Sequence, residues 1–184
     1  MAKWFFEPGH TAAAFSVRHR MVTFVRGHFK DSMARLSSIR RARARFPSRP
    51  RSKLLESGQV KRRATPTSRA RTFSTWRKHP KITFAGKQVE LAGANEAVLT
   101  GALTIRGITR TVPLRVHYLG QWQTPWWEEG VDKGPKTRAG FAATATINRH
   151  DFGVSWNSTL DRGGVVVGNM VDITIDAEAI LQEG

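Results

Sequence analysis

The side chains of Phe141-Ala-Ala-Thr-Ala-Thr-Ile147 follow a period of two, the strongest fold signal in the sequence. Residues of one parity lie on one face of a β-strand. Phe141, Ala143, Ala145 and Ile147 therefore share one face, and the two threonines lie on the other. The run Val171-Asp-Ile-Thr-Ile175 repeats the pattern. Both runs predict strands with one buried and one exposed face.

The same alternation extends over most of the chain outside residues 32–77. It occurs at Ile82 and Phe84, at Leu99, Leu103 and Ile105, from Val112 to Tyr118, at Val165 and Val167, at Phe15, Val17, His19 and Met21, and in a short strand from Val25 to Phe29. Glycines separate several of these runs, which predicts an all-β antiparallel barrel or sandwich. We expect a loop around Trp122, Trp126 and Trp127 and a short helix over 176–182. A filled barrel and one that encloses an apolar ligand both fit this pattern.

Charge is concentrated in one block of the 184 residues. The chain has 30 Lys and Arg, 14 Asp and Glu, six His and no Cys, with a formal net charge of +16 and a pI near 11.5. Residues 32–77 hold 14 of the basic residues and one acidic residue, a net charge of +13, which leaves +3 for the rest. The total charge favours a nucleic-acid partner, but the distribution indicates a near-neutral globular domain with one basic segment.

Composition also excludes several classes. The length predicts one domain over 1–184. No apolar run approaches the roughly 18–20 residues of a membrane-spanning helix, so we expect no transmembrane segment. The amino terminus lacks the apolar stretch of a secretory signal, which favours a cytoplasmic location. Without cysteine there are no disulfides, thiolate metal sites or thiol catalysis.

Several segments together resemble the YceI-like family of lipocalin-like, polyisoprenoid-binding barrels, over residues 4–31 and 78–180. The matching segments, in the family's order, are Trp4, Pro8-Gly-His-Thr11, Phe15-Ser-Val-Arg-His19, Val25-Arg-Gly-His-Phe29, His79-Pro-Lys-Ile-Thr-Phe84, Gly101-Ala-Leu-Thr-Ile-Arg-Gly107, Ala139-Gly-Phe141, Ile147-Asn-Arg-His-Asp-Phe-Gly-Val154 and Val171-Asp-Ile-Thr-Ile175. The resemblance implies an antiparallel barrel around a large apolar cavity, with no catalytic residues, no metal and no cofactor apart from a bound lipid. Many relatives are exported, whereas no signal peptide is seen here.

The expected function is non-enzymatic binding of a long-chain isoprenoid-type lipid, for transport, storage or sensing. Expected partners are an isoprenoid-chain lipid or a quinone, with a homodimer as an alternative to a monomer and with no specific nucleic acid. The side chains expected to line the ligand are Phe15, Val17, His19, Phe29, Phe84, Leu103, Ile105, Phe141, Phe152 and Trp156. The alternative function is nonspecific binding of nucleic acid or an anionic surface by the Arg-rich segment 35–77.

Other polar pairs receive structural interpretations. His10 and His19 lack the spacing of a preformed metal site, and no carboxylate cluster accompanies them in the sequence. His150-Asp151 resembles part of a catalytic relay, but no G-x-S-x-G motif is present. Arg149 shares parity with Asp151, so we expect the two to pair. Phe152-Gly153 and Arg106-Gly107 fit turns.

The resemblance stops between Asp31 and Lys78, although the gap has about the length found in the family. Runs such as Arg40-Arg-Ala-Arg-Ala-Arg45 replace the family's strands here, so we expect residues 32–77 to form a poorly ordered loop that disrupts the barrel. Replacement at constant length suggests two compensating frameshifts. Met and Trp each have a single codon, and both are compatible with this hypothesis. The Met33 codon, ATG, would overlap the codons of an intended Asp-Gly. The Trp76 codon, TGG, would overlap the codons of an intended Val-Glu before Lys78-His79-Pro80, and family members often carry these residues there.

The frameshift hypothesis predicts one base missing just after the codon of Asp31 and one regained near that of Arg77. Sequencing the gene across both positions in an independent isolate is the measurement. Finding the written codons intact there would refute the hypothesis.

Overall fold

The computed structural model describes residues 3–33, 35–36, 58–61, 79, 81–160 and 163–182. Within these residues, ten strands form a single antiparallel sheet. The two helical segments there are single 3-10 turns, so neither is a candidate for a membrane-crossing helix. In chain order the elements are β1 (Lys3–Phe6), η1 (Pro8–His10), β2 (Ala12–His19), β3 (Thr23–Met33), β4 (Arg35–Leu36), β5 (Gly58–Lys61), β6 (Lys81–Leu91), β7 (Glu96–Ile105), β8 (Ile108–Glu128), β9 (Val131–Asn148), η2 (Arg149–Phe152) and β10 (Val167–Gln182).

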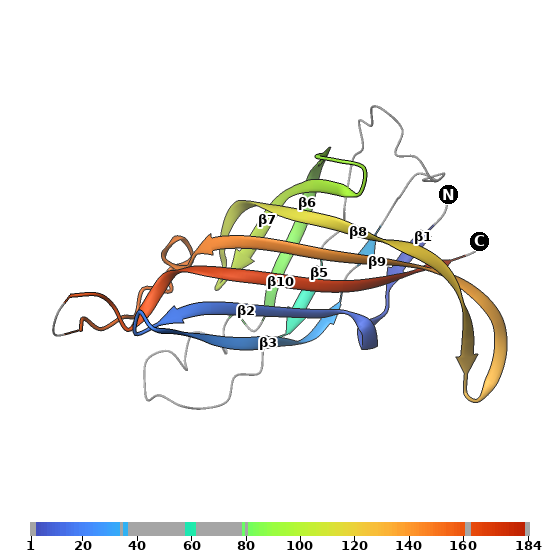
Figure 1. Ribbon diagram of the computed structural model, residues 1–184, viewed down its shortest axis with the longest axis horizontal. Helices are drawn as coiled ribbons and strands as arrows, with labels where there is room; N and C mark the ends of the chain where they lie inside the picture. Colours follow the sequence, from blue (N-terminus) through green and yellow to red (C-terminus); the bar gives the residue numbers. More distant parts are fainter. Residues whose placement is uncertain are drawn as a thin grey trace.

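The sheet closes on itself, which confirms the antiparallel barrel expected from the sequence. Neighbouring strands follow the order β2-β3-β5-β6-β7-β8-β9-β10, and β10 pairs again with β2. One edge of β10 carries β9, whereas the other carries β2 along Val167–Asp176 and then β1 along Ala179–Gln182. The long strands run along the long axis of the molecule, and the β8–β9 hairpin curls beyond the others at one end (Figure 1).

The inward face is the parity that the sequence predicted. Ile173 lies opposite Phe15 on β2 and Ala145 on β9, and Val116 lies opposite Ala143. Asp172, Thr174 and Asp176 are exposed, whereas the alternating Val171, Ile173 and Ile175 are partly buried. The register therefore gathers the apolar positions of each strand inside the barrel.

The expectation of a loop throughout residues 32–77 is wrong for the part of this segment that the structure describes. Strand β3 continues to Met33, β4 pairs with β1, and β5 lies between β3 and β6 with Val60 opposite Ser32 and Ile82. The ring is thus continuous where a disrupted wall was expected. Strand pairing uses backbone groups, so the exposed edges of β3 and β6 can pair with a segment whose sequence does not alternate. The remaining residues of 32–77 lie outside the described residues.

Two local expectations were also wrong. Trp122, Trp126 and Trp127 lie in strand β8, paired with β9 across two register shifts, and not in a loop. Residues 176–182 continue β10 because β1 and β9 supply partners on both edges, so no helix forms there. In both cases tertiary pairing overrides local propensity.

The Arg106-Gly107 turn is confirmed, and Gly153 follows η2 in the left-handed conformation at φ 66°.

Two aromatic rings lie over glycines of neighbouring strands. A Cβ built on Gly27 would lie 2.6 Å from the Phe15 ring, and one built on Gly101 would lie 2.5 Å from the Phe84 ring. Rings can cover these positions only because glycine has no side chain. Phe15 and Phe84 therefore lie along the barrel wall and do not project across the interior.

The surroundings of the two glycines differ, which yields a prediction. A Cβ on Gly101 would also lie 2.5 Å from the carbonyl oxygen of Ala85, whereas Gly27 meets only the outer end of the Phe15 ring. Backbone cannot give way as a side chain can, so we expect Gly101→Ala to lower the free energy of unfolding by about 1–3 kcal/mol and Gly27→Ala to cost less. Urea unfolding of both variants measures this difference. Equal losses would show that Phe15 is as rigidly held as the Ala85 backbone.

Candidate functional site

One end of the barrel interior is tightly packed. Phe152 on η2 is 1% exposed, and it packs with five further buried residues from β7, β8 and β9: Leu103, Val112, Leu114, Ala145 and Ile147. Asn148 begins η2 by accepting a hydrogen bond from the His150 backbone N–H at 3.0 Å. This turn places Phe152 as a plug, so this end of the barrel is filled by side chains.

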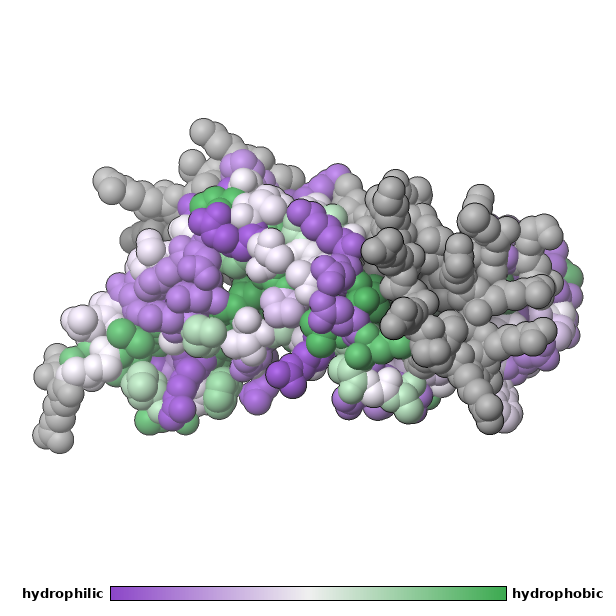
Figure 2. All heavy atoms as spheres, turned by 90° about the horizontal axis from the view of Figure 1, so that it is seen from above, coloured by the Kyte–Doolittle hydropathy of each residue, from purple (hydrophilic) through white to green (hydrophobic). Residues whose placement is uncertain are grey.

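The middle of the barrel is packed less completely. The inward side chains Phe15, Val17, Phe29 and Phe141 remain only partly buried, although they face the inside of a closed ring. Phe15 and Phe29 contact each other with ring centroids 5.3 Å apart. Figure 2 shows apolar surface in the middle of one face, framed by hydrophilic residues. These partly buried, inward apolar side chains form the candidate ligand-contacting surface.

A second aromatic group lies farther along β8 and β9. The Phe141 ring lies 5.6 Å from that of Tyr118 and 6.4 Å from that of Phe6. Burial raises the pKa of the Tyr118 hydroxyl, because the phenolate would be poorly solvated there. Tyr118 shares the parity of Val116, so alternation alone signals its inward position.

The ten residues expected to line a ligand thus divide into groups. Phe15, Val17, Phe29 and Phe141 belong to the half-buried middle. Leu103 and Phe152 belong to the packed end, where Phe84 and Ile105 pack against them. His19, half-buried, ends β2 opposite Thr23 and Val167. The inward orientation expected of Trp156 is wrong, because its side chain is 65% exposed.

Arg149 explains why Trp156 points outward. Its guanidinium, 6% exposed, donates to the backbone carbonyls of Val154, Trp156, Val167 and Gly168. Burial lowers the pKa of Arg149 from its ordinary value. These bonds draw the backbone inward and leave the Trp156 ring outside. The pairing expected between Arg149 and Asp151 is therefore wrong, since its guanidinium is directed to these carbonyls.

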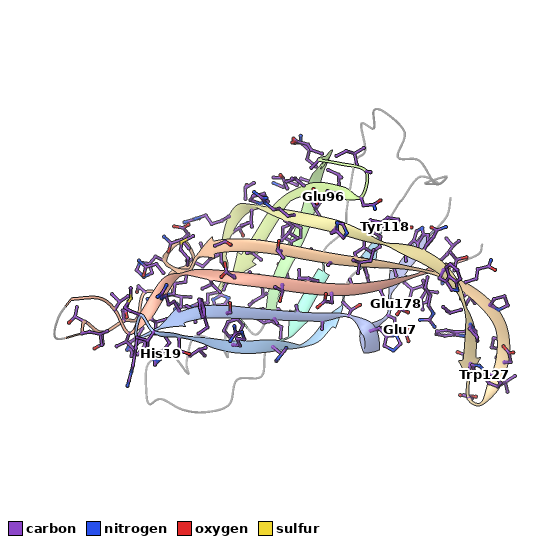
Figure 3. All side chains as sticks on the ribbon, in the orientation of Figure 1. Glu7, His19, Glu96, Tyr118, Trp127 and Glu178 are labelled. Atoms are coloured by element: carbon purple, nitrogen blue, oxygen red, sulfur yellow. The ribbon has the colours of Figure 1, made fainter. Side chains whose placement is uncertain are left out.

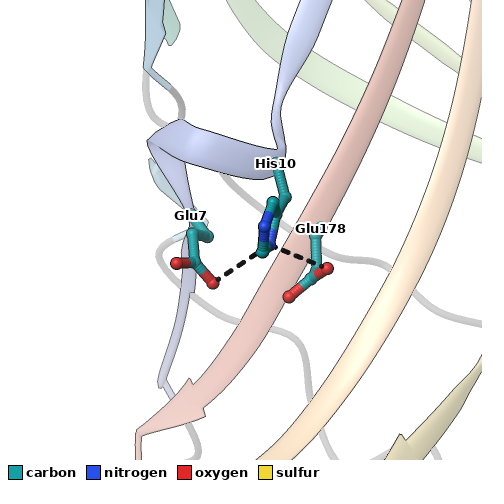
Figure 4. Close-up of side chains that lie close together, drawn as sticks. All are labelled: Glu7, His10 and Glu178. Atoms are coloured by element: carbon teal, nitrogen blue, oxygen red, sulfur yellow. Dashed lines mark ion pairs between the residues drawn. The ribbon is translucent and has the colours of Figure 1, made fainter. Parts of the chain in front are cut away.

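An ionic cluster joins the amino-terminal turn to β9 and β10. Arg138 donates to Glu178 and to Glu7, at 2.6 Å for Glu7, and also to Thr124 Oγ1 at 2.6 Å. His10 Nδ1 lies 3.5 Å from Glu7 Oε2 and 3.3 Å from Glu178 Oε2 (Figure 4). Burial alone would lower the pKa of Arg138, but its hydrogen bonds and charge pairing with the two carboxylates raise it.

This cluster corrects the expectation that His10 has no carboxylates beside it. One ligand atom from each of Glu7, His10 and Glu178 lies within 4.8 Å of the others, a grouping that could hold a metal ion. Arg138 already occupies both carboxylates, so a cation would have to displace a guanidinium. The absence of a metal role remains a prediction. The sequence could not reveal this cluster because Glu178 and Arg138 lie far from His10 along the chain.

A closed antiparallel barrel with an apolar inward face, packed at one end and half-covered in the middle, defines a lipocalin-like barrel. Residues 4–179 match the model of the YceI-like domain, so the chain belongs to the YceI-like family. Membership supports a non-enzymatic binding protein, and His150 and Asp151 are both exposed on η2.

Similar proteins share the fold over nearly the whole chain. A UPF0312 protein of Staphylococcus aureus is 28% identical and covers 100% of both chains. One from Pseudomonas putida is 27% identical over 96% of this chain and 84% of its own. Among solved structures, BcnA of Burkholderia cenocepacia has a TM-score of 0.60 at 16% identity, over 94% of this chain and 98% of its own. The Campylobacter jejuni YceI protein has a TM-score of 0.57 at 22% identity, over 90% of each chain.

The ionic cluster yields a prediction about stability. Replacing Arg138 with Met keeps the length of the stem but removes the guanidinium that donates to both Glu7 and Glu178. Because the Arg138 side chain is only 15% exposed, we expect a loss of about 1–3 kcal/mol in the free energy of unfolding. Arg115→Met, at an exposed position on β8, is the control and should change it by less than about 0.5 kcal/mol. Chemical denaturation measures both, and equal effects would show that the cluster contributes nothing.

Proposed function

We propose that the barrel binds a long-chain isoprenoid-type lipid, such as a quinone or a polyprenyl compound, along its half-buried inward face. The observation that carries this proposal is the incomplete burial of Phe15, Phe29 and Phe141 inside a closed ring. Apolar side chains in this position gain free energy when a ligand covers them. The family to which the chain belongs supports a binding role of this kind.

The shape of the wall also suits a narrow, flexible chain. The Phe15 ring lies over Gly27, so it contributes apolar surface without crossing the interior. Small inward residues such as Ala143 add little bulk. Burying each CH2 group of a chain contributes about 0.8 kcal/mol, so a long hydrocarbon would bind without any charged contact.

Extraction of the purified protein with organic solvent, followed by mass spectrometry, tests the proposal directly. We expect a long-chain isoprenoid lipid that is retained when the protein is first washed at high salt, because apolar burial is insensitive to counterions. Binding through the Arg-rich segment 35–77 would instead fall steeply with salt. Finding no long-chain lipid in protein from a sequence-verified gene would contradict the proposal.

Two adjacent alanines on β9 give a matched pair of variants. Ala143 faces inward opposite Val116 and Ile175, and Ala142 has the outward parity opposite His117 and Asp176. If lipid fills the barrel, Ala143→Phe occupies its space. We then expect a lower ratio of lipid to protein with little loss of stability, and Ala142→Phe should leave that ratio unchanged.

A packed interior would instead lose about 1–3 kcal/mol of stability in Ala143→Phe, because the ring would overpack it. That loss, with an unchanged lipid ratio, would exclude a ligand at this position.

A further inference from the structure

One end of the barrel exposes a group of apolar side chains. The turn between β2 and β3 carries Val22, 85% exposed, with Met21 at 45% and Phe24 at 46%. Trp156, 65% exposed, lies in the loop before β10, and a Cβ built on Gly164 of that loop would lie 3.3 Å from Met21 Cγ. The two segments are joined by a hydrogen bond from the Arg20 backbone N–H to the Val166 carbonyl at 2.8 Å. We call Met21, Val22, Phe24 and Trp156 the turn patch.

Cationic side chains border Met21, Val22 and Phe24 of the turn patch. Arg18, Arg20 and Arg26 are all exposed, and the chain has no acidic residue from Ala12 to Lys30. The Arg18 guanidinium donates to the Met21 carbonyl at 2.7 Å, and that of Arg26 lies 5.7 Å from the centre of the Phe24 ring. The arginines are thus held next to the apolar side chains. An apolar tip bordered by fixed cations matches the surface of an anionic bilayer, which combines negative headgroups with hydrocarbon beneath.

The opposite end provides a contrast within the same molecule. Figure 3 places His19 and Trp127 at opposite ends of the long axis. The β8–β9 hairpin also exposes apolar residues, Trp122, Trp127 and Val131, and it carries a depression lined by Gln121, Trp122, Gln123 and Thr137. Its tip, however, carries Glu128, Glu129 and Asp132 against Lys133 and Lys136, a net charge of −1. These carboxylates would be repelled by an anionic bilayer, so the charge distribution favours the turn patch.

The backbone of the β2–β3 turn provides an independent observation. Arg20 and Met21 both have positive φ, at 49° and 62°. The hairpin turns at Arg106-Gly107 and Glu129-Gly130 each place glycine at their second position. An Asn-Gly pair would relieve the strain at Arg20-Met21. Arg20 and Met21 therefore strain this turn and do not favour the fold. Such strain points to a role of their side chains in binding.

We infer that the turn patch docks this barrel end on the surface of an anionic lipid bilayer, with Met21, Val22 and Trp156 entering the interface and the arginines contacting headgroup phosphates. The docking is peripheral. It is independent of lipid bound inside the barrel, which solvent extraction tests separately. The choice of a bilayer over a second copy of the chain rests on the arginines, because two such patches facing each other would bring like charges together.

Sedimentation with phosphatidylglycerol-containing vesicles tests the inference. The Arg-rich segment 35–77 can itself bind such vesicles by charge, so the variants must change the apolar contact. We expect Val22→Glu to lower vesicle partitioning about tenfold or more. The matched control is Val131→Glu, an exposed valine at the opposite hairpin, and it should bind as the wild type does. Equal binding of Val22→Glu and the wild type would overturn the inference.

A second variant separates docking from folding. The double substitution Arg20→Asn with Met21→Gly should raise Tm, because it relieves the left-handed strain, and should still weaken vesicle binding.

Brominated lipids should quench part of the tryptophan fluorescence of the wild type, and Trp156→Phe should remove that part. Quenching that persists in Trp156→Phe and disappears in Trp122→Phe would place the contact at the other end. A concentration-dependent dimer that Val22→Glu abolishes, without vesicle binding, would assign the patch to a second copy of the chain.

Discussion

The two backbone edges of β10 hold the barrel together. One edge pairs with β9 from Met170 to Ile180, while the other pairs first with β2 and then with β1. Every amide and carbonyl buried in a sheet needs a partner, and β10 supplies partners to strands from both termini. The inward register, the ionic cluster of Arg138 with Glu7 and Glu178, and the position of the β2–β3 turn all follow from this pairing. A change that displaces β10 would therefore affect features at both ends of the barrel.

The packing inside the ring changes along its axis because η2 fills one end. Arg149 holds the backbone after η2 through four carbonyls, and Phe152 is thereby fixed among Leu103, Leu114 and Ile147. Farther along, the glycine beneath Phe15 leaves room for that ring along the wall. The same strands thus form a core at one end and a partly buried apolar surface in the middle.

Alternation in the sequence predicted the strands, their inward parity and most of the half-buried residues, because burial of one face imposes a period of two. Three features escaped it for physical reasons. Strand β5 pairs through its backbone, so its side chains carry little signal. The outward ring of Trp156 depends on contacts from Arg149 to carbonyls of its own loop. The cluster of Glu7, His10, Arg138 and Glu178 assembles only when both ends of the chain meet at β9.

The pairing of β2 with β10 also dictates the order in which the chain can fold. Residues 12–19 are made before their partners at 167–176, which lie 148–164 residues farther along the chain. Until then the nascent barrel has two open edges and an uncovered apolar interior, the features that promote strand-to-strand aggregation. Contacts so distant in sequence also form slowly. Closure is therefore a late event in barrel formation, and the open edges stay exposed until β10 pairs with β2.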